Sequence, residues 1–181
     1  AEELGLAESS DGLLELSDDV VIGEDIRSLL NLNDLSIELD LTPNRGDCLS
    51  MIGLAREVGV LTRQEVKTAK VEIVDATMGA EFPIEITEKD GCPRYLGRVI
   101  KNVNLSAESP VWMREKLRRS GLRSIDPIVD VTNYVLMEFG QPMHAFDYST
   151  LEGKIEVRMA NEKEKLTLLD GKEVELTPDI L

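Results

Sequence analysis

The side chains best suited to chemistry in this sequence lie between residues 126 and 147. Thr132 and Asn133 are adjacent, in the middle of a predicted helix that begins at Pro127. Threonine and asparagine are poor formers of a helix interior, so their presence there indicates that their side chains have a use. The alternative is a solvated helix face with a threonine that hydrogen-bonds its own backbone. Pattern alone favours this alternative.

His144 is the one histidine of the chain, and Pro142 stiffens the backbone just before it. An imidazole can act as a general base, or it can donate a hydrogen bond to a ribose or a carbonyl group. No Ser, Cys or Asp partner is fixed by its spacing, so chemistry alone favours a packed or surface role. No glycine-rich phosphate loop, nucleophile elbow or His-Glu-x-x-His pattern occurs, so the commonest enzyme signatures are absent.

A group of basic residues precedes this region, in a predicted helix that starts at Pro110 and in the loop after it. The group consists of Arg114, Lys116, Arg118, Arg119 and Arg123. One interpretation is contact with nucleic-acid phosphates. The other is a solvated helix face that neutralises an acidic neighbouring module, which is the usual meaning of a charge run. Trp112, near the start of the same helix, is expected to be a core anchor.

The balance of charge argues against an autonomous nucleic-acid-binding protein. The chain of 181 residues has a net charge of −15, and residues 1–60 hold 14 acidic and three basic side chains. Phosphate contacts by Lys and Arg dominate the affinity of such proteins, so a basic surface is expected of them. If this chain serves a nucleic acid, most of the binding must come from elsewhere.

Composition narrows the class further. Hydrophobic residues make up 42% and charged residues 30%, which is ordinary for a soluble globular chain. No apolar run approaches the roughly 20 residues that cross a bilayer, and the first six residues show no secretory signal. Cys48 and Cys92 are too few for a disulfide framework or a cysteine-rich zinc site, and we expect both to be small buried residues. A reducing, cytoplasmic location is therefore expected.

Two consecutive helices are predicted from their end signals. Each has a capping residue, a proline in the first turn and a glycine stop. The signals are Ser109, Pro110 and Gly121 for the first helix, and Asp126, Pro127 and Gly140 for the second. The second helix carries Thr132 and Asn133, and its core face is expected to hold Ile128, Val131 and Val135.

Further elements are expected on both sides of these helices. A short helix or turn is predicted over 22–30, and a helix over 48–60, capped by Asp47. Strands are predicted at 12–16, 35–41, 82–87, 94–103 and 154–159. Gly97 is expected at a bulge or a close contact, and Asp170-Gly171 between two strand-like runs predicts a β-hairpin. A polar stretch over 62–70 is interpreted as a connector, and the order of elements predicts an α+β fold.

Five blocks of the sequence resemble the beta chain of bacterial phenylalanyl-tRNA synthetase, in the same order. They are residues 39–50, 92–98, 112–123, 129–135 and 140–147. Blocks of this length with correct spacing are far more specific than a lone motif. The resemblance covers essentially all 181 residues, and it implies an internal fragment of a longer, multidomain chain.

The resemblance implies a domain organisation. Residues 1–34 would be the tail of an inserted oligonucleotide-binding-like barrel, and residues 35–70 would be the returning half of the amino-terminal domain with its connector. Residues 71–181 would be the first part of the editing, tRNA-binding module. The fold class expected on this basis is α+β, with a small mixed domain followed by a β-rich editing module that contains two consecutive helices.

In the family that the sequence resembles, the editing module hydrolyses tyrosine wrongly attached to the phenylalanine tRNA. A pocket for phenylalanine cannot fully reject an analogue that only adds a hydroxyl group, so a second, hydrolytic site is needed. By resemblance, His144 is the catalytic editing-site histidine near the ester and the terminal ribose, and Thr132, Asn133 and Pro142 line the pocket. Other editing residues, including a glutamate that reads the tyrosine hydroxyl, would lie beyond Leu181, so the site here would be incomplete.

The resemblance also implies partners and cofactors. The family's enzyme attaches phenylalanine to its tRNA with ATP and magnesium, and it pairs alpha and beta chains as an α2β2 tetramer. The ATP and magnesium site lies on the alpha chain, so no cofactor is expected in this fragment. The expected partners are the alpha chain and the phenylalanine tRNA, with no membrane and no DNA, and Arg118 and Arg119 become candidate contacts to tRNA phosphates. The alternative is a non-catalytic tRNA- or protein-interaction module of the same fold.

Overall fold

The computed structural model describes residues 12–16, 18, 20–168 and 170–181. The chain divides into two compact units, each built from two separate segments. The helical unit comprises Ala1–Val71 and Asn104–Ala145, and the strand unit comprises Glu72–Val103 and Phe146–Leu181. The first break, at Val71, comes directly after the stretch interpreted as a connector. The assignment of residues to parent domains remains a prediction.

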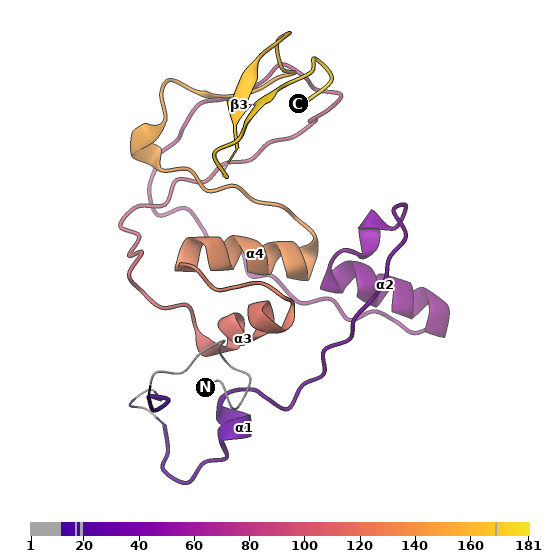
Figure 1. The fold of residues 1–181 in the computed structure, drawn as a ribbon, viewed down its shortest axis with the longest axis vertical. Helices are drawn as coiled ribbons and strands as arrows, with labels where there is room; N and C mark the ends of the chain where they lie inside the picture. The colour runs from indigo at the N-terminus through magenta and orange to yellow at the C-terminus, as the bar shows by residue number, and fades with distance from the viewer. Residues whose placement is uncertain (1–11, 17, 19, 169) are drawn as a thin grey trace. The chain divides into compact units, whose positions relative to one another are not determined.

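The helical unit is organised around α4. Its elements are α1 (Ile26–Leu29), η2 (Gly46–Cys48), α2 (Met51–Thr62), α3 (Val111–Arg119) and α4 (Pro127–Phe139). Helix α4, drawn in orange in Figure 1, contacts both α3 and α2. Among the described residues, the buried hydrophobic side chains are Leu30, Cys48, Met113 and Leu117, and all of them belong to this unit.

The ends of α3 and α4, and the start of α4, agree with the sequence prediction. Gly121 follows α3 with a φ of 78°, and Gly140 follows α4 with a φ of 72°, both in the left-handed region that favours glycine. The carboxylate of Asp126 accepts hydrogen bonds from the backbone N–H groups of Ile128 at 2.8 Å and Val129 at 3.0 Å. The start and stop of α4 are therefore confirmed.

Helix α2 begins three residues later than predicted, with a different cap. The Ser50 hydroxyl accepts a hydrogen bond from the Gly53 N–H at 3.1 Å. Asp47 lies in η2 instead, and its carboxylate pairs with Arg45 at 3.1 Å, so the prediction that Asp47 caps the helix is wrong. A Cβ on Gly53 would lie 1.8 Å from the Asp47 carbonyl oxygen. The tight turn that brings Asp47 back against the helix therefore requires glycine there.

The strand unit contains two small sheets and η3 (Tyr148–Thr150). Strands β1 (Ile84–Ile86) and β2 (Ile155–Val157) pair in parallel. Strands β3 (Lys165–Thr167) and β4 (Glu173–Glu175) pair antiparallel, with Leu166 opposite Val174. Gly171, in the turn between them, has a φ of 82°. The predicted hairpin is thus confirmed, and the mixture of helices and strands agrees with the α+β class at that coarse level.

Three of the predicted strands are wrong. Residues 12–16, 35–41 and 94–103 have no strand pairing in the structure. Alternation of apolar and polar residues indicates which side chains can face a core. A strand forms only where a second strand supplies the backbone hydrogen bonds. The close contact predicted at Gly97 is present, because a Cβ there would lie 3.0 Å from the Ile84 Cδ1 atom.

Two predicted core positions are exposed. Val131, expected on the core face of α4, keeps 44% of its surface exposed, and Trp112 keeps 42%. Helix α3 turns Met113 and Leu117 inward, and Trp112 lies one position away, about 100° around the helix. Cys48 is buried as expected, while Cys92 is half-buried. No helix among the described residues is long and apolar enough to cross a membrane.

Candidate functional site

Asp130 is the only buried residue of α4, all of which is described. Both of its carboxylate oxygens accept hydrogen bonds within the helical unit. Oδ2 accepts from the hydroxyl groups of Ser109 and Ser124, each at 2.5 Å, and Oδ1 accepts from the Ile125 N–H at 3.0 Å. Its side chain is fully buried, although it lies outside the predicted core face of Ile128, Val131 and Val135.

The electrostatics of Asp130 follow from these contacts. Burial raises the pKa of its carboxyl group, but the hydrogen bonds from Ser109, Ser124 and Ile125 lower that pKa by more. The nearby positive charge of Arg114 lowers it further, so the pKa lies below the ordinary value of 3.8. The group is therefore a carboxylate at neutral pH, fully supplied with donors.

Ser109 serves this carboxylate and does not cap α3. The N-cap position of α3 is Pro110, which makes no side-chain capping hydrogen bond. Ser109 is buried, with 5% of its surface exposed, and its hydroxyl donates to Asp130. The prediction of a Ser109 cap is therefore wrong, because a buried carboxylate on another helix takes the hydroxyl group that a local cap would have used.

Thr132 and Asn133 lie half-buried on α4. The Thr132 hydroxyl donates its hydrogen to the Val129 carbonyl oxygen at 2.9 Å. The back-bonding threonine that the sequence left open is therefore present. Because the hydroxyl hydrogen is used in this way, the Thr132 oxygen can offer only its lone pairs to a further partner, and that partner must be a donor.

Pro142 and His144 lie in the exposed segment that follows the left-handed Gly140. The Pro142 carbonyl oxygen accepts a hydrogen bond from the Gln141 side-chain amide at 3.2 Å. This segment has no regular secondary structure up to Asp147, the residue that caps η3. The structure thus places two of the four predicted editing-site residues on a helix and two on an exposed stretch of coil.

Arg118 and Arg119 both pair with carboxylates of the chain itself. Arg118 pairs with Glu115 at 2.9 Å, and Arg119 pairs with Asp34 at 2.9 Å and with Glu115 at 3.5 Å. The Arg119 guanidinium also donates to the Asn31 carbonyl oxygen, and 15% of its side chain is exposed. These pairs match the interpretation that the basic residues neutralise an acidic neighbouring segment; contact with phosphate remains a prediction.

Lys116 lies over two aromatic rings. Its ammonium group is 5.8 Å from the centre of the Trp112 ring and 5.5 Å from that of Tyr134. The two rings meet edge to face, with 5.3 Å between their centres. Because Trp112 is exposed, it joins α3 to α4 at the surface through this cluster and is not the core anchor that we expected.

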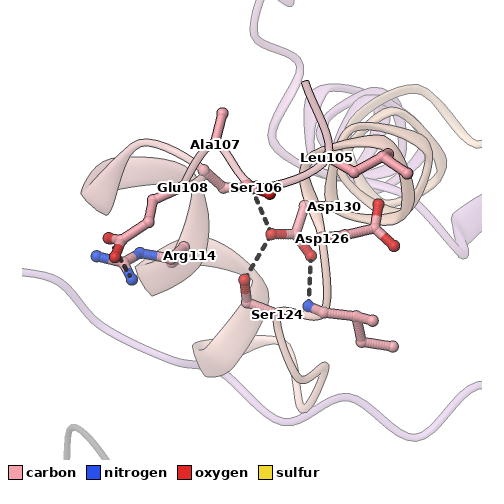
Figure 2. A pocket seen from close by; sticks show the side chains of 10 residues that line it. Leu105, Ser106, Ala107, Glu108, Arg114, Ser124, Asp126 and Asp130 are labelled. Carbon is pink, nitrogen blue, oxygen red and sulfur yellow. Dashed lines mark hydrogen bonds and ion pairs between the residues drawn. The ribbon is translucent and has the colours of Figure 1, made fainter. Parts of the chain in front are cut away.

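A polar cavity of about 260 Å³ lies between the segments that precede α3 and α4 (Figure 2). Residues 105–109, 124–126, Arg114 and Asp130 line it. Glu108, Asp126 and Asp130 outnumber the single guanidinium of Arg114, which pairs with Glu108 at 3.3 Å, so a phosphate group is disfavoured there. Among the described residues no group of His, Cys, Asp or Glu could hold a metal ion. None of the predicted site residues lines this cavity.

The carboxyl-terminal half of the chain matches a family model. Residues 91–181 match the B3/4 domain. The chain belongs to the B3/4 domain family. The matched range includes α3, α4 and the segment with Pro142 and His144, so all of the candidate residues lie inside the family domain.

Curated relatives of this B3/4 domain protein extend the match to the rest of the chain. It is 59% identical over 179 residues to the phenylalanine–tRNA ligase beta subunits of Vibrio parahaemolyticus and Shewanella oneidensis, which covers 99% of this chain and 22% of each relative. It is 57% identical over 181 residues to that of Pseudomonas savastanoi pv. phaseolicola, covering all of this chain and 23% of the relative. The resemblance inferred from the five sequence blocks is confirmed, and the chain spans less than a quarter of the length of these relatives.

Asp130 is the residue of interest that sequence reasoning missed. A signal for it exists: an acidic residue lies between Val129 and Val131 in an otherwise apolar first turn, and two serines precede the starts of the two helices. A charged residue in an apolar helix turn is costly unless it is paired. That pattern indicates a buried, hydrogen-bonded carboxylate, although it does not identify the donors.

Proposed function

We propose that this chain is part of the beta subunit of a phenylalanine–tRNA ligase, and that the α4 region contributes to hydrolysis of tyrosine wrongly attached to the phenylalanine tRNA. The observation that carries the proposal is the identity of up to 59% over nearly the whole chain to relatives with that name. The complete enzyme would attach phenylalanine to its tRNA with ATP and magnesium, together with an alpha chain. By the resemblance, the ATP and magnesium site would lie on that alpha chain.

The chemistry of the proposed reaction is simple in outline. The oxygen of a water molecule bonds to the ester carbonyl carbon, the bond from that carbon to the ribose oxygen breaks, and a proton passes from the water to the ribose oxygen. The products are free tyrosine and intact tRNA. A group that accepts the proton from water, or one that holds the ribose in place, accelerates this reaction.

The residues on α4 and after it are suited to these tasks. His144 is exposed, so an ester at the end of a long tRNA can reach it. The Thr132 oxygen offers lone pairs to a donor on the aminoacyl group, such as its ammonium, because its own hydrogen is bonded to Val129. Asn133 can both donate and accept. Pro142 limits the backbone freedom of the segment that carries the histidine.

The charge of the chain bears on how the tRNA is held. With Arg118 and Arg119 paired to carboxylates, and a net charge of −15, most of the phosphate binding must come from other parts of the complete enzyme. We therefore propose that this region acts on the acyl end of the tRNA and contributes little to overall affinity.

Substitution of His144 in the complete enzyme tests the proposal. His144→Ala should slow the deacylation of tyrosyl-tRNA and leave the ATP–pyrophosphate exchange rate for phenylalanine unchanged. Loss of a general base lowers the rate by about 10²- to 10⁴-fold, whereas loss of one positioning hydrogen bond lowers it by about tenfold. His144→Gln separates the two roles, since an amide can hydrogen-bond but cannot act as a base at neutral pH.

The outcomes of this experiment are distinct. Full deacylation activity in His144→Gln, with loss in His144→Ala, assigns a positioning role. Equal losses of deacylation and phenylalanine activation would mean that the substitution only disturbs the fold. An unchanged deacylation rate in His144→Ala would refute the assignment and favour a non-catalytic tRNA- or protein-interaction module.

A further inference from the structure

Asp130 connects α4 to the segment before α3, which is distant in sequence, and to the segment that leads directly into α4. Its carboxylate lies on the first turns of α4, and its donors come from the segment before α3, through Ser109, and from the segment before α4, through Ser124 and Ile125. Figure 2 shows the carboxylate at the centre of these contacts. No other side chain of α4, a helix described in full, is buried.

Stability alone is a weak reason to keep a buried carboxylate there. Removing a charge from water is costly, and a well-packed apolar side chain of similar volume is often as stabilising or more so. A fully hydrogen-bonded buried group can instead fix the orientation of its helix. Two serine hydroxyls and one backbone N–H can all bond to the carboxylate in only one orientation of the helix. Asp130 is therefore suited to fix how α4 is rotated about its axis.

The rotation of α4 decides where the proposed pocket residues point. Successive residues of a helix are about 100° apart, so Thr132 projects from the side of α4 roughly opposite to Asp130. A rotation of the helix that broke the Asp130 contacts would move the Thr132 oxygen by the same angle. The Thr132 hydroxyl is itself fixed on the helix by its bond to Val129, so it follows the backbone and cannot compensate.

We propose that Asp130 is a positioning residue for the editing reaction: its hydrogen bonds with Ser109, Ser124 and Ile125 fix the rotation of α4, and thereby the direction in which Thr132 and Asn133 face the substrate. This inference rests on the proposed function. It assigns Asp130 no contact with the tRNA or the aminoacyl group.

The test uses steady-state deacylation of tyrosyl-tRNA by the complete enzyme. Asp130→Ala should lower kcat by about tenfold, the effect of one misplaced hydrogen bond, with KM changed by less than about twofold, because most tRNA binding lies elsewhere. Asp130→Asn should recover most of kcat, since its amide keeps the shape of the carboxylate and can accept from Ile125 and donate to the serine oxygens. Phenylalanine activation should stay unchanged in both.

A matched control separates positioning from general loss of stability. Met113 is buried on α3 and has no hydrogen bond to Asp130, so Met113→Ala loosens the helical unit without touching the carboxylate. It should leave kcat unchanged at a temperature where the enzyme stays folded. The double variant of Asp130→Ala with Thr132→Val should be no slower than the slower single variant, because Asp130→Ala already displaces the Thr132 oxygen.

Each result has a separate meaning. Full additivity of Asp130→Ala and Thr132→Val, or a kcat of Asp130→Ala equal to that of Met113→Ala, would overturn the positioning role. Absence of rescue by Asp130→Asn would overturn it as well. If Thr132→Val and His144→Ala both leave deacylation unchanged, then the proposed function itself fails, and the inference fails with it.

Discussion

The two ends of α4 are held in different ways, and each end controls a different part of the candidate site. At the amino end, Asp126 caps the helix and Asp130 accepts three hydrogen bonds. At the carboxyl end, the left-handed Gly140 ends the helix, and the chain continues as an exposed segment. Thr132 and Asn133 therefore lie on a helix whose first turn is held by hydrogen bonds. The path of the chain to Pro142 and His144 depends on the left-handed backbone conformation of Gly140.

The comparison teaches how a site can combine fixed and adaptable parts. A buried, fully hydrogen-bonded end gives a helix one orientation. An exposed segment after a helix stop is less constrained, and such segments belong to the less stable parts of a fold. On the proposed function, the acyl group would meet fixed residues on α4, and the histidine would approach it from the more adaptable side.

The largest expected effect comes from changing the stop of α4. Gly140→Ala should destabilise the end of the helix by about 2 kcal/mol, because a side chain is strained in the left-handed region. In addition, its Cβ would lie 3.0 Å from the Ser50 hydroxyl oxygen. Hydrogen exchange of the amides over 127–139 in the complete protein measures the loss.

Gly121→Ala is the matched control for this change. Gly121 also has a left-handed φ, of 78°, but no atom lies within 4 Å of the position of its Cβ. The cost there should be that of the conformation alone, about 1 kcal/mol, measured on the amides of α3. Equal costs at the two glycines would show that the contact with Ser50 does not help to fix the end of α4.

A smaller effect is expected at the amino end of α4. Asp126→Ala removes the acceptor for the Ile128 and Val129 N–H groups, which should cost about 1 kcal/mol in local hydrogen exchange. Asp126→Asn should stay within a few tenths of a kcal/mol of the unchanged protein, since asparagine caps equally well. Because Asp130 still holds the helix, tyrosyl-tRNA deacylation should fall less than in Gly140→Ala. The reverse order would refute the idea that the amino end has two anchors.

The smallest effect concerns how the free energy of unfolding depends on pH through Asp130, and it vanishes at neutral pH. Its pKa is lowered in the folded state, mainly by hydrogen bonds that outweigh burial. The stability that it provides is therefore present above the ordinary pKa of 3.8, and it is lost as the pH falls through the lower folded value. Unfolding midpoints in urea should decline more steeply in acid for the unchanged protein than for Asp130→Asn, and should show no such difference between pH 6 and 7. Identical acid profiles would contradict this.

The ends of α3 and α4 and the start of α4 were predictable because their signals act over a single turn. Asp126 reaches amides two and three residues away, and Gly140 sets only its own backbone angle. The Asp170-Gly171 hairpin is local in the same sense. The strands predicted over 35–41 and 94–103 were wrong because strand formation needs a partner, and no alternation of side chains says where that partner is.

The candidate site likewise has a part that sequence reasoning found and a part that it missed. Sequence reasoning selected Thr132, Asn133, Pro142 and His144 by residue type and resemblance, and the structure locates them on α4 and on the segment after it. It did not find Asp130, because the burial of this carboxylate depends on its hydrogen-bond donors. One of them, Ser109, is 21 residues away in the sequence. Whether these residues edit tRNA remains a prediction.

Sequence reasoning located the ends of α3 and α4, the start of α4 and the turn of the hairpin, and it found the resemblance to phenylalanine–tRNA ligase beta subunits. All of these depend on residue identity within a short window or on the order and spacing of a few sequence blocks. The burial of Asp130 and the pairing of Arg119 with Asp34, 85 residues away, became visible only in the fold. The physical reason is that burial and charge pairing depend on which distant segments meet, and no local propensity fixes that.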